Sequence, residues 1–401
     1  MGEREEMPHV VPEILKWARE TAGFDLEEAA RRIALNASKA GTGAERLAAL
    51  EAGDTEPTAT MLNRMAKQYH RPLLTFYLPE VPRRADVGQD FRTLPERADP
   101  ANALLYALLR DIKARQSLVR EVVEDDDEAL EVAFVGTRRP ADGVDAIAAA
   151  IIDGIDFDRA QYRAAQTREA AFTYLRSRAE SAGVYVMLAG SLGSWQTAIE
   201  VSVFRGFAIA DRLAPFVVVN DQDAKSAWSF TLLHELAHLC IGATGVSGSG
   251  APAAGIERLC NDVAAAVLVD PEEIAGLPIA ALEVSINGAA ERWRVSRSMV
   301  AYQLLRAGRI DEARWRSLTN SFRQTWLEQR ANERAAARDR EGGPNYYTIR
   351  RHRIGVALLN LVQRGMRDGS LTPVRAAKIL GVKPMAVYTL IGDAPRPVRA
   401  A

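Results

Sequence analysis

The 401-residue sequence has only two cysteines and five histidines, and it contains no long uncharged apolar run. Two cysteines cannot form the disulfide framework of a small secreted protein, so we expect a protein of the reducing cytoplasm. A membrane-spanning helix needs about 20 consecutive apolar residues. The charged N-terminus MGEREEMPHVV also lacks the apolar stretch of a signal peptide. The expectation is a cytoplasmic protein with no membrane partner.

The sequence also lacks an excess of charge of either sign. Its 51 basic and 52 acidic residues give a net charge of −1, which argues against a nucleic-acid binder that is basic along its whole length. The balance is uneven along the chain. Residues 1–81 hold 10 basic and 13 acidic residues, whereas residues 344–401 hold 10 basic and two acidic residues. The charge that favours nucleic acid is therefore concentrated in the last 58 residues.

Hydrophobic periodicity indicates an α+β protein that is mostly helical. We expect an N-terminal helical bundle, a strap with a helical linker, a central α+β domain, a polar helical linker and a basic helical C-terminal domain, at residues 1–81, 82–165, 166–310, 311–343 and 344–401. Short β-branched runs in the central domain predict a small sheet with strands at residues 184–190, 198–204, 206–210 and 215–220. Two helices follow, at about residues 224–240 and 256–268.

The most informative motif is His234-Glu235-Leu236-Ala237-His238. A spacing of four residues puts both imidazoles on one helix face, one turn apart, where they can share a metal ion. Glu235 is placed to act on a water molecule rather than to bind the metal. The flanking residues are uncharged, so these polar side chains need partners. The alternative is a pair of buried histidines that are hydrogen-bonded in a core, and we favour the metal site.

A catalytic zinc site keeps three protein ligands and one open position, and no third histidine lies near the motif. Glu257 is the nearest downstream acid on the next helix, and Asp262 competes with it from a different helix face. Cys240 and Cys260 are alternative ligands, although both are also explained as small buried hydrophobic residues. The rarity of histidine favours Glu257. We expect Zn²⁺, and the same ligand set also suits Mn²⁺ or Fe²⁺.

The stretches VVVNDQDAKSAWSFTLLHELAHL and ERLCNDVAAAVLVDP resemble the ImmA/IrrE family of gluzincin-like metallopeptidases. The resemblance covers about residues 170–305 and implies a zincin-like central domain. It implies that His234, His238 and Glu257 hold the zinc and that Glu235 is the general base. Peptidases of this family cut a helix-turn-helix repressor, so the resemblance also implies a protein substrate of repressor or antitoxin type.

The N-terminal part is similar to the Xre/Cro-type helix-turn-helix, through ILKWARETAGFDLEEAARRI and LAALEAGDTEPTATMLNRMAKQY. This resemblance implies a bacterial or phage regulator, often encoded beside a toxin. If the unit binds DNA, the expected contacts are Lys39, Thr42 and Arg46, near the start of the third helix. Its acidic balance and its long turn, ALNASKAGTGAER, equally favour a dimerisation or docking module, which would make the protein a homodimer.

Residues 371–391, LTPVRAAKILGVKPMAVYTLI, form a second helix-turn-helix-like pattern. Its Thr-Pro start predicts the beginning of a helix, Gly381 predicts the turn and Pro384 predicts the next helix. The expected contacts to DNA, or to an acidic partner such as a toxin, are Arg375, Lys378 and Lys383. Residues 293–310 carry a weaker pattern of the same kind, which we interpret as a packed helical hairpin.

Two functions follow from these patterns. The leading hypothesis is a zinc-dependent endopeptidase and regulator that cleaves a helix-turn-helix repressor or antitoxin-type protein, with Glu235 as general base. The alternative is a DNA-binding transcriptional regulator or antitoxin of a toxin–antitoxin pair, in which the zinc site is a sensor or a relic. The presence of Glu235 favours the enzyme, because a relic has no use for a general base.

Overall fold

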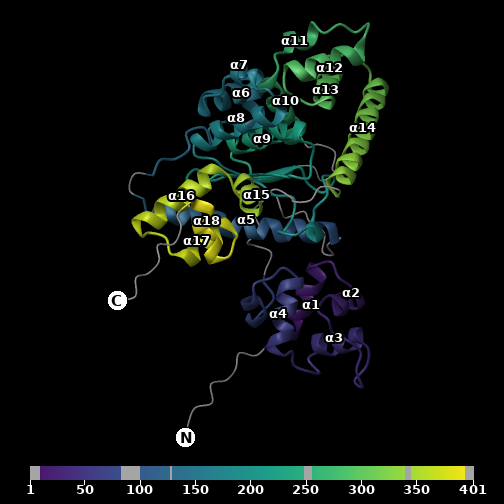
Figure 1. Cartoon of the computed structure of the whole chain (residues 1–401), viewed down its shortest axis with the longest axis vertical. Coiled ribbons are helices and arrows are strands. Elements are labelled where there is room, and N and C mark those ends of the chain that lie inside the picture. The colour runs from purple at the N-terminus through teal and green to yellow at the C-terminus, as the bar shows by residue number, and fades with distance from the viewer. Residues whose placement is uncertain (1–9, 83–99, 127–128, 248–254, 339–344, 393–401) are drawn as a thin grey trace. The chain divides into compact units, whose positions relative to one another are not determined.

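The computed structural model describes residues 10–82, 100–126, 129–247, 255–338 and 345–392 (Figure 1). Contacts divide the chain into two units. The first holds residues 1–111 with 191–203, and the second holds residues 112–190 with 204–401. The expected mostly helical α+β class is confirmed. Among the described helices, none has both the length and the apolar character that crossing a bilayer requires.

The first unit is built from short helices around one apolar core. They are α1 (Pro12–Thr21), α2 (Leu26–Arg32), α3 (Gly43–Ala52), α4 (Ala59–Gln68) and the 3₁₀ helix η1 (Leu73–Tyr77). Three of them begin at a side chain that accepts a backbone N–H of the first turn, namely Asp25, Thr42 and Thr58. The core gathers buried residues such as Ile14, Leu47, Leu62, Met65 and Phe76. Helix α5 (Pro100–Glu124) begins in this unit and ends in the other.

The second unit contains a four-stranded sheet in the order β1-β3-β2-β4. Its strands are β1 (Tyr185–Leu188), β2 (Gly206–Ile209), β3 (Phe216–Val219) and β4 (Gly245–Ser247). Strands β1 and β3 are parallel, and β2 is antiparallel to both β3 and β4. Among the described residues, β4 is thus one end of the sheet and pairs on one side only.

Helices surround this sheet. Those before and between the strands are α6 (Gly143–Gly154), α7 (Arg159–Ala164), α8 (Arg168–Ser181) and α9 (Lys225–Cys240). Those after the strands are α10 (Gly255–Leu268), α11 (Pro271–Ala275), α12 (Leu282–Arg292), α13 (Arg297–Arg306) and α14 (Glu312–Arg338). Figure 1 shows α9 above the strands and α15 (Tyr346–Ile354) below them.

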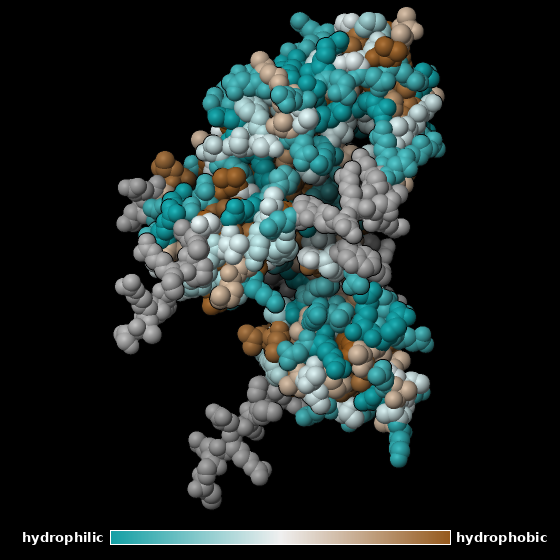
Figure 2. Space-filling model, viewed as in Figure 1, coloured by the Kyte–Doolittle hydropathy of each residue, from teal (hydrophilic) through white to brown (hydrophobic). Residues whose placement is uncertain are grey.

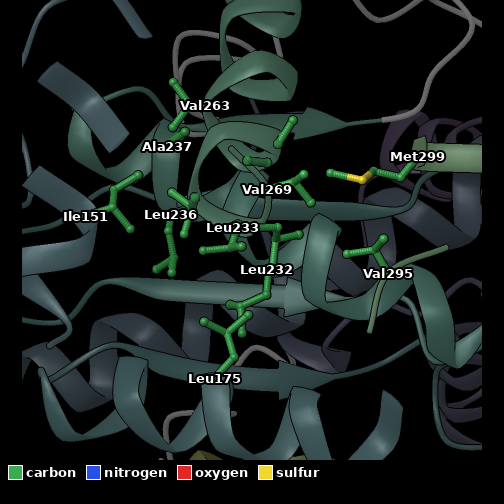
Figure 3. Packing of buried hydrophobic residues seen from close by; sticks show 14 of the residues in the cluster. Ile151, Leu175, Leu232, Leu233, Leu236, Ala237, Val263, Val269, Val295 and Met299 are labelled. Atoms are coloured by element: carbon green, nitrogen blue, oxygen red, sulfur yellow. The ribbon is translucent and has the colours of Figure 1, made fainter. Parts of the chain in front are cut away.

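Helix α9 is buried from Trp228 to Cys240, apart from the half-buried Phe230. Figure 3 shows Leu232, Leu233 and Leu236 among apolar side chains from neighbouring elements, including Ile151 and Val263. All three leucines have no exposed surface. A helix held in this way presents its few polar side chains in fixed positions.

The C-terminal residues form α15, α16 (Val356–Asp368), α17 (Pro373–Leu380) and α18 (Pro384–Ile391). Thr372 caps α17, Gly381 turns the chain in a left-handed conformation and α18 begins at Pro384, as the sequence predicts. A buried side chain of α8 joins this block to the sheet. Arg176 donates to the carbonyl oxygens of Val186 and His352.

One expected strand is not formed, and one observed strand is not expected from the sequence. Residues 198–204 form turns and one isolated bridge instead of a strand. Their β-branched pattern predicts an extended chain, but within the described residues the segment pairs with no strand, and a turn bond joins Val203 to Glu200. Strand β4 lies instead in a glycine-rich stretch whose composition predicts a loop.

The surface is mostly hydrophilic in the view of Figure 2, with hydrophobic residues in separate spots. Exposed apolar side chains in the second unit include Val284, Val374 and Met385. Single exposed apolar residues of this kind are ordinary on a protein surface.

Candidate metal centre

The two motif histidines lie on α9, one helical turn apart, with ring centroids separated by 4.9 Å. His234 is 4% exposed and His238 is 2% exposed. Such burial is costly for imidazoles unless their nitrogen atoms have partners. The partners come from α10, which packs beside α9 and brings Glu257 to both rings.

Three ligand atoms converge at this point. His238 Nε2 lies 3.1 Å from His234 Nε2. The carboxylate of Glu257 places one oxygen 3.3 Å from His234 Nε2 and the other 3.2 Å from His238 Nε2. Ligands held at about 2.0–2.1 Å from a tetrahedral zinc ion lie roughly 3.3 Å from one another. The observed separations therefore fit a zinc ion without movement of the backbone.

Electrostatics also favour a cation at this place. Burial alone would raise the pKa of Glu257, but its hydrogen bonds to the two histidines lower that pKa to about 2. Burial alone would lower the pKa of His238, but hydrogen bonds to Cys260 and Glu257 and the charge of Glu235 raise it to about 11. The pocket thus stabilises positive charge between the rings, in the form of protons when no metal is bound.

Asn261 fixes the orientation of the first histidine. Its Oδ1 lies 3.0 Å from His234 Nδ1 and accepts a hydrogen bond from it. An imidazole that donates through Nδ1 carries its free electron pair on Nε2, the atom that faces Glu257. The sequence places Asn261 on the same helix face as Glu257, but nothing in the sequence assigns it this role.

Glu235 lies on α9 between the two histidines and is fully buried. Its carboxylate rests against β2 at Gly206, where an added Cβ atom would come within 2.7 Å of Oε1. Only glycine leaves room for this approach. The charge of Glu235 also contributes to the raised pKa of His238.

The other candidates for the third ligand are an ion-paired carboxylate and two buried thiols. Asp262 forms an ion pair with Arg306 at 2.8 Å. Cys240 is buried, and this burial raises its pKa to about 11. Cys260 contacts His238, and burial raises the pKa of its thiol. Among the described residues, the group able to hold a metal ion is His234, His238 and Glu257.

The residues expected to contact DNA are placed as follows. In the first unit, Lys39 and Thr42 are exposed, while Arg46 donates to the carbonyl oxygen of Asn36 at 2.7 Å. The carboxylate of Glu45 caps the same helix end, which makes that end less attractive to a phosphate.

In the C-terminal block, Lys378 and Lys383 are exposed, whereas Arg375 forms an ion pair with Glu121. Other basic residues of this block are used inside it. Arg350 and Arg351 donate to the carbonyl ends of α17 and α18. The net charge of +8, from ten basic and two acidic residues at positions 344–401, therefore overstates the charge that the block presents to a partner.

Comparison with known proteins adds one finding. Residues 180–305 match the family model of the IrrE N-terminal-like domain, Peptidase_M78. This region is thus similar to a metallopeptidase domain, and it contains the two histidines, Glu235, Glu257 and Asn261. The match ends before α14 and includes none of residues 1–179. No curated protein matches the chain, and no solved structure matches it.

Proposed function

We propose that this protein is a zinc-dependent endopeptidase. The proposal is supported most directly by the three separations of 3.1, 3.2 and 3.3 Å among His234 Nε2, His238 Nε2 and the Glu257 carboxylate. The similarity of residues 180–305 to a metallopeptidase family supports it independently. Glu257 remains 32% exposed, so the centre is open to a substrate on the side of α10.

The chain's own residues divide the chemistry between them. His234, His238 and Glu257 would hold the zinc, and zinc supplies Lewis acidity that lowers the pKa of water and polarises a peptide carbonyl. Glu235 would accept the proton of the attacking water and pass it to the departing amine. The buried position of Glu235 against Gly206 keeps its carboxylate in place for both transfers.

We further propose that the substrate is a regulatory protein of helix-turn-helix repressor or antitoxin type, as the resemblance to ImmA/IrrE peptidases implies. An extended segment of such a protein would pair with β4, the end strand of the sheet. Strand β4 pairs with β2 at Gly206, the residue that contacts Glu235, so a bound segment would run close to the general base.

The test is a cleavage assay with the full chain, zinc and the helix-turn-helix proteins encoded beside its gene. The Glu235→Gln variant is expected to bind zinc as the unaltered protein does and to lose turnover by at least about a hundredfold. Glu272→Gln, at an exposed position of α11, serves as a matched control and is expected to cleave normally. Unchanged turnover in Glu235→Gln would contradict the mechanism.

The second candidate function is DNA binding by the C-terminal block. The observation that favours it is the pair of exposed lysines, Lys378 and Lys383, on either side of the turn between α17 and α18. A mobility-shift assay on the DNA upstream of the gene tests it. Replacing both lysines by alanine is expected to abolish the shift and to leave zinc binding unchanged.

A further inference from the structure

A cleft of about 1040 Å³ lies in the second unit, at the carboxyl ends of β1 and β3. It is lined by Leu188 at the end of β1, by residues 221–226, which lead from β3 into the first turn of α9, and by residues of α14 and α15. None of the three metal ligands lines it. In sheets with parallel strands, the carboxyl ends of the strands are where small ligands bind.

Two helices begin at this cleft. Helix α8 begins at Arg168 and helix α9 begins at Lys225, and both residues line the cleft. The N-cap of α9 is Ala224, whose side chain cannot accept a hydrogen bond. In the described part of the chain, the backbone N–H groups of Lys225 and Ser226 have no protein acceptor. They are donors at the positive end of a helix dipole.

A buried indole provides an independent observation. Trp228 lines the cleft and is 95% buried, between the rings of Phe172 at 5.3 Å and His352 at 6.3 Å. Within the described residues, its Nε1–H donates to no acceptor. A buried donor without a partner costs stability, so an acceptor brought by a ligand would stabilise this N–H group.

The acidic residues of the cleft are paired with basic residues. Glu169 is paired with Lys225, Glu291 with Arg168, Asp221 with Arg353 and Asp223 with Arg205, at 2.6, 2.6, 2.6 and 2.9 Å. The acceptors on the wall are therefore already satisfied, while donors on the first turn of α9 are left over. A ligand that complements such a wall brings acceptor oxygens.

We propose that this cleft binds a small phosphorylated molecule, with its phosphate at the first turn of α9 beside Trp228. A phosphate offers three terminal oxygens to the Nε1–H of Trp228 and the amides of Lys225 and Ser226. The rest of the ligand lies against Leu188 and Ile349, in a space large enough for a nucleotide. His234 lies on the same helix as Ser226, about 12 Å further along the helix axis. A ligand bound at the first turn would therefore stabilise the helix that carries two of the metal ligands.

The experiment follows the indole N–H signals of the six tryptophans by ¹H–¹⁵N NMR on the full chain. The probes are inorganic phosphate and adenosine 5′-monophosphate, and the Trp228 signal is assigned by its loss in Trp228→Phe. The proposal predicts a saturable downfield shift of that signal with both probes. It also predicts that Trp228→Phe weakens nucleotide binding about tenfold in calorimetry, because the ring is kept and one donor is lost.

Trp315 provides a matched control, because its Nε1–H is also buried without an acceptor but lies outside the cleft. Trp315→Phe is expected to bind both probes within twofold of the unaltered protein. Lys225→Gln changes an exposed side chain and is expected to weaken binding without affecting folding. A Trp228 signal that neither probe moves at millimolar concentration would overturn the proposal, as would equal affinities of Trp228→Phe and Trp315→Phe.

Discussion

Replacing Asn261 by alanine tests whether the metal centre depends on the residues behind its ligands. Asn261 does not face the metal position. It accepts a hydrogen bond from His234 Nδ1 at 3.0 Å, and His234 is only 4% exposed. The substitution removes this acceptor from a buried donor and leaves the ring free to rotate or to change tautomer.

The size of the effect follows from two considerations. A buried N–H group left without an acceptor costs about 1–3 kcal/mol. Removal of a partner behind a metal-binding histidine lowers metal affinity about 10–100-fold, which is about 1.4–2.8 kcal/mol. The two ranges agree. We therefore expect Asn261→Ala to weaken zinc binding by one to two orders of magnitude while the fold is retained.

The assay is competition for zinc between the protein and a chromophoric chelator at fixed pH. Asn261→Asp keeps an acceptor oxygen at the same place and is expected to bind zinc at least as tightly as Asn261→Ala does. Asp262→Asn alters the next residue, whose carboxylate pairs with Arg306, and serves as the control with unchanged affinity. If Asn261→Ala binds zinc within twofold of the unaltered protein, the role assigned to Asn261 is wrong.

Three further predictions address the base, the core and the pH dependence. Gly206→Val is expected to displace the Glu235 carboxylate, lowering turnover more than zinc affinity, as cleavage and metal-binding assays would show. Leu236→Ala removes a fully buried side chain of α9 and is expected to lower the free energy of unfolding by about 2–5 kcal/mol in urea titrations, whereas a change below about 0.5 kcal/mol would refute the packing. In the metal-free protein, the raised pKa of His238 stabilises the fold at pH values below about 6.5, the pKa of histidine in the unfolded chain. This stabilisation is lost as the pH rises toward about 11, the pKa of His238 in the folded protein. Stability is therefore expected to fall between pH 7 and 10 in the presence of a chelator, and a flat or rising profile would contradict this.

The sequence predicts the metal-binding helices well because their signals are local. The four-residue spacing of His234 and His238 and the apolar surroundings of α9 depend only on helical geometry. The helix that carries Glu257 is equally clear from its period, and its N-terminal position is what brings the carboxylate to both rings. Rarity of histidine then leaves few candidates for the third ligand.

The rest depends on contacts between distant segments. The role of Asn261 requires the packing of α10 against α9, and the role of Gly206 requires the position of β2 beneath Glu235. Strand pairing explains the differences at residues 198–204 and at β4. The β-branched residues 198–204 pair with no described strand and form no ladder, whereas the glycine-rich residues of β4 pair with β2 and do form one. Charge in the C-terminal block is misleading for a similar reason, because Arg350 and Arg351 bind carbonyl oxygens within that block.

X-ray absorption spectroscopy of the zinc-loaded full chain tests the central claim most directly. The account predicts one zinc ion per chain with only nitrogen and oxygen neighbours at about 2.0–2.1 Å and imidazole scattering from two histidines. It also predicts that this signature is lost in Glu257→Gln. A sulfur neighbour at about 2.3 Å, which would make Cys260 or Cys240 a ligand, or an unchanged spectrum in Glu257→Gln, would contradict the assignment of His234, His238 and Glu257 as the metal centre.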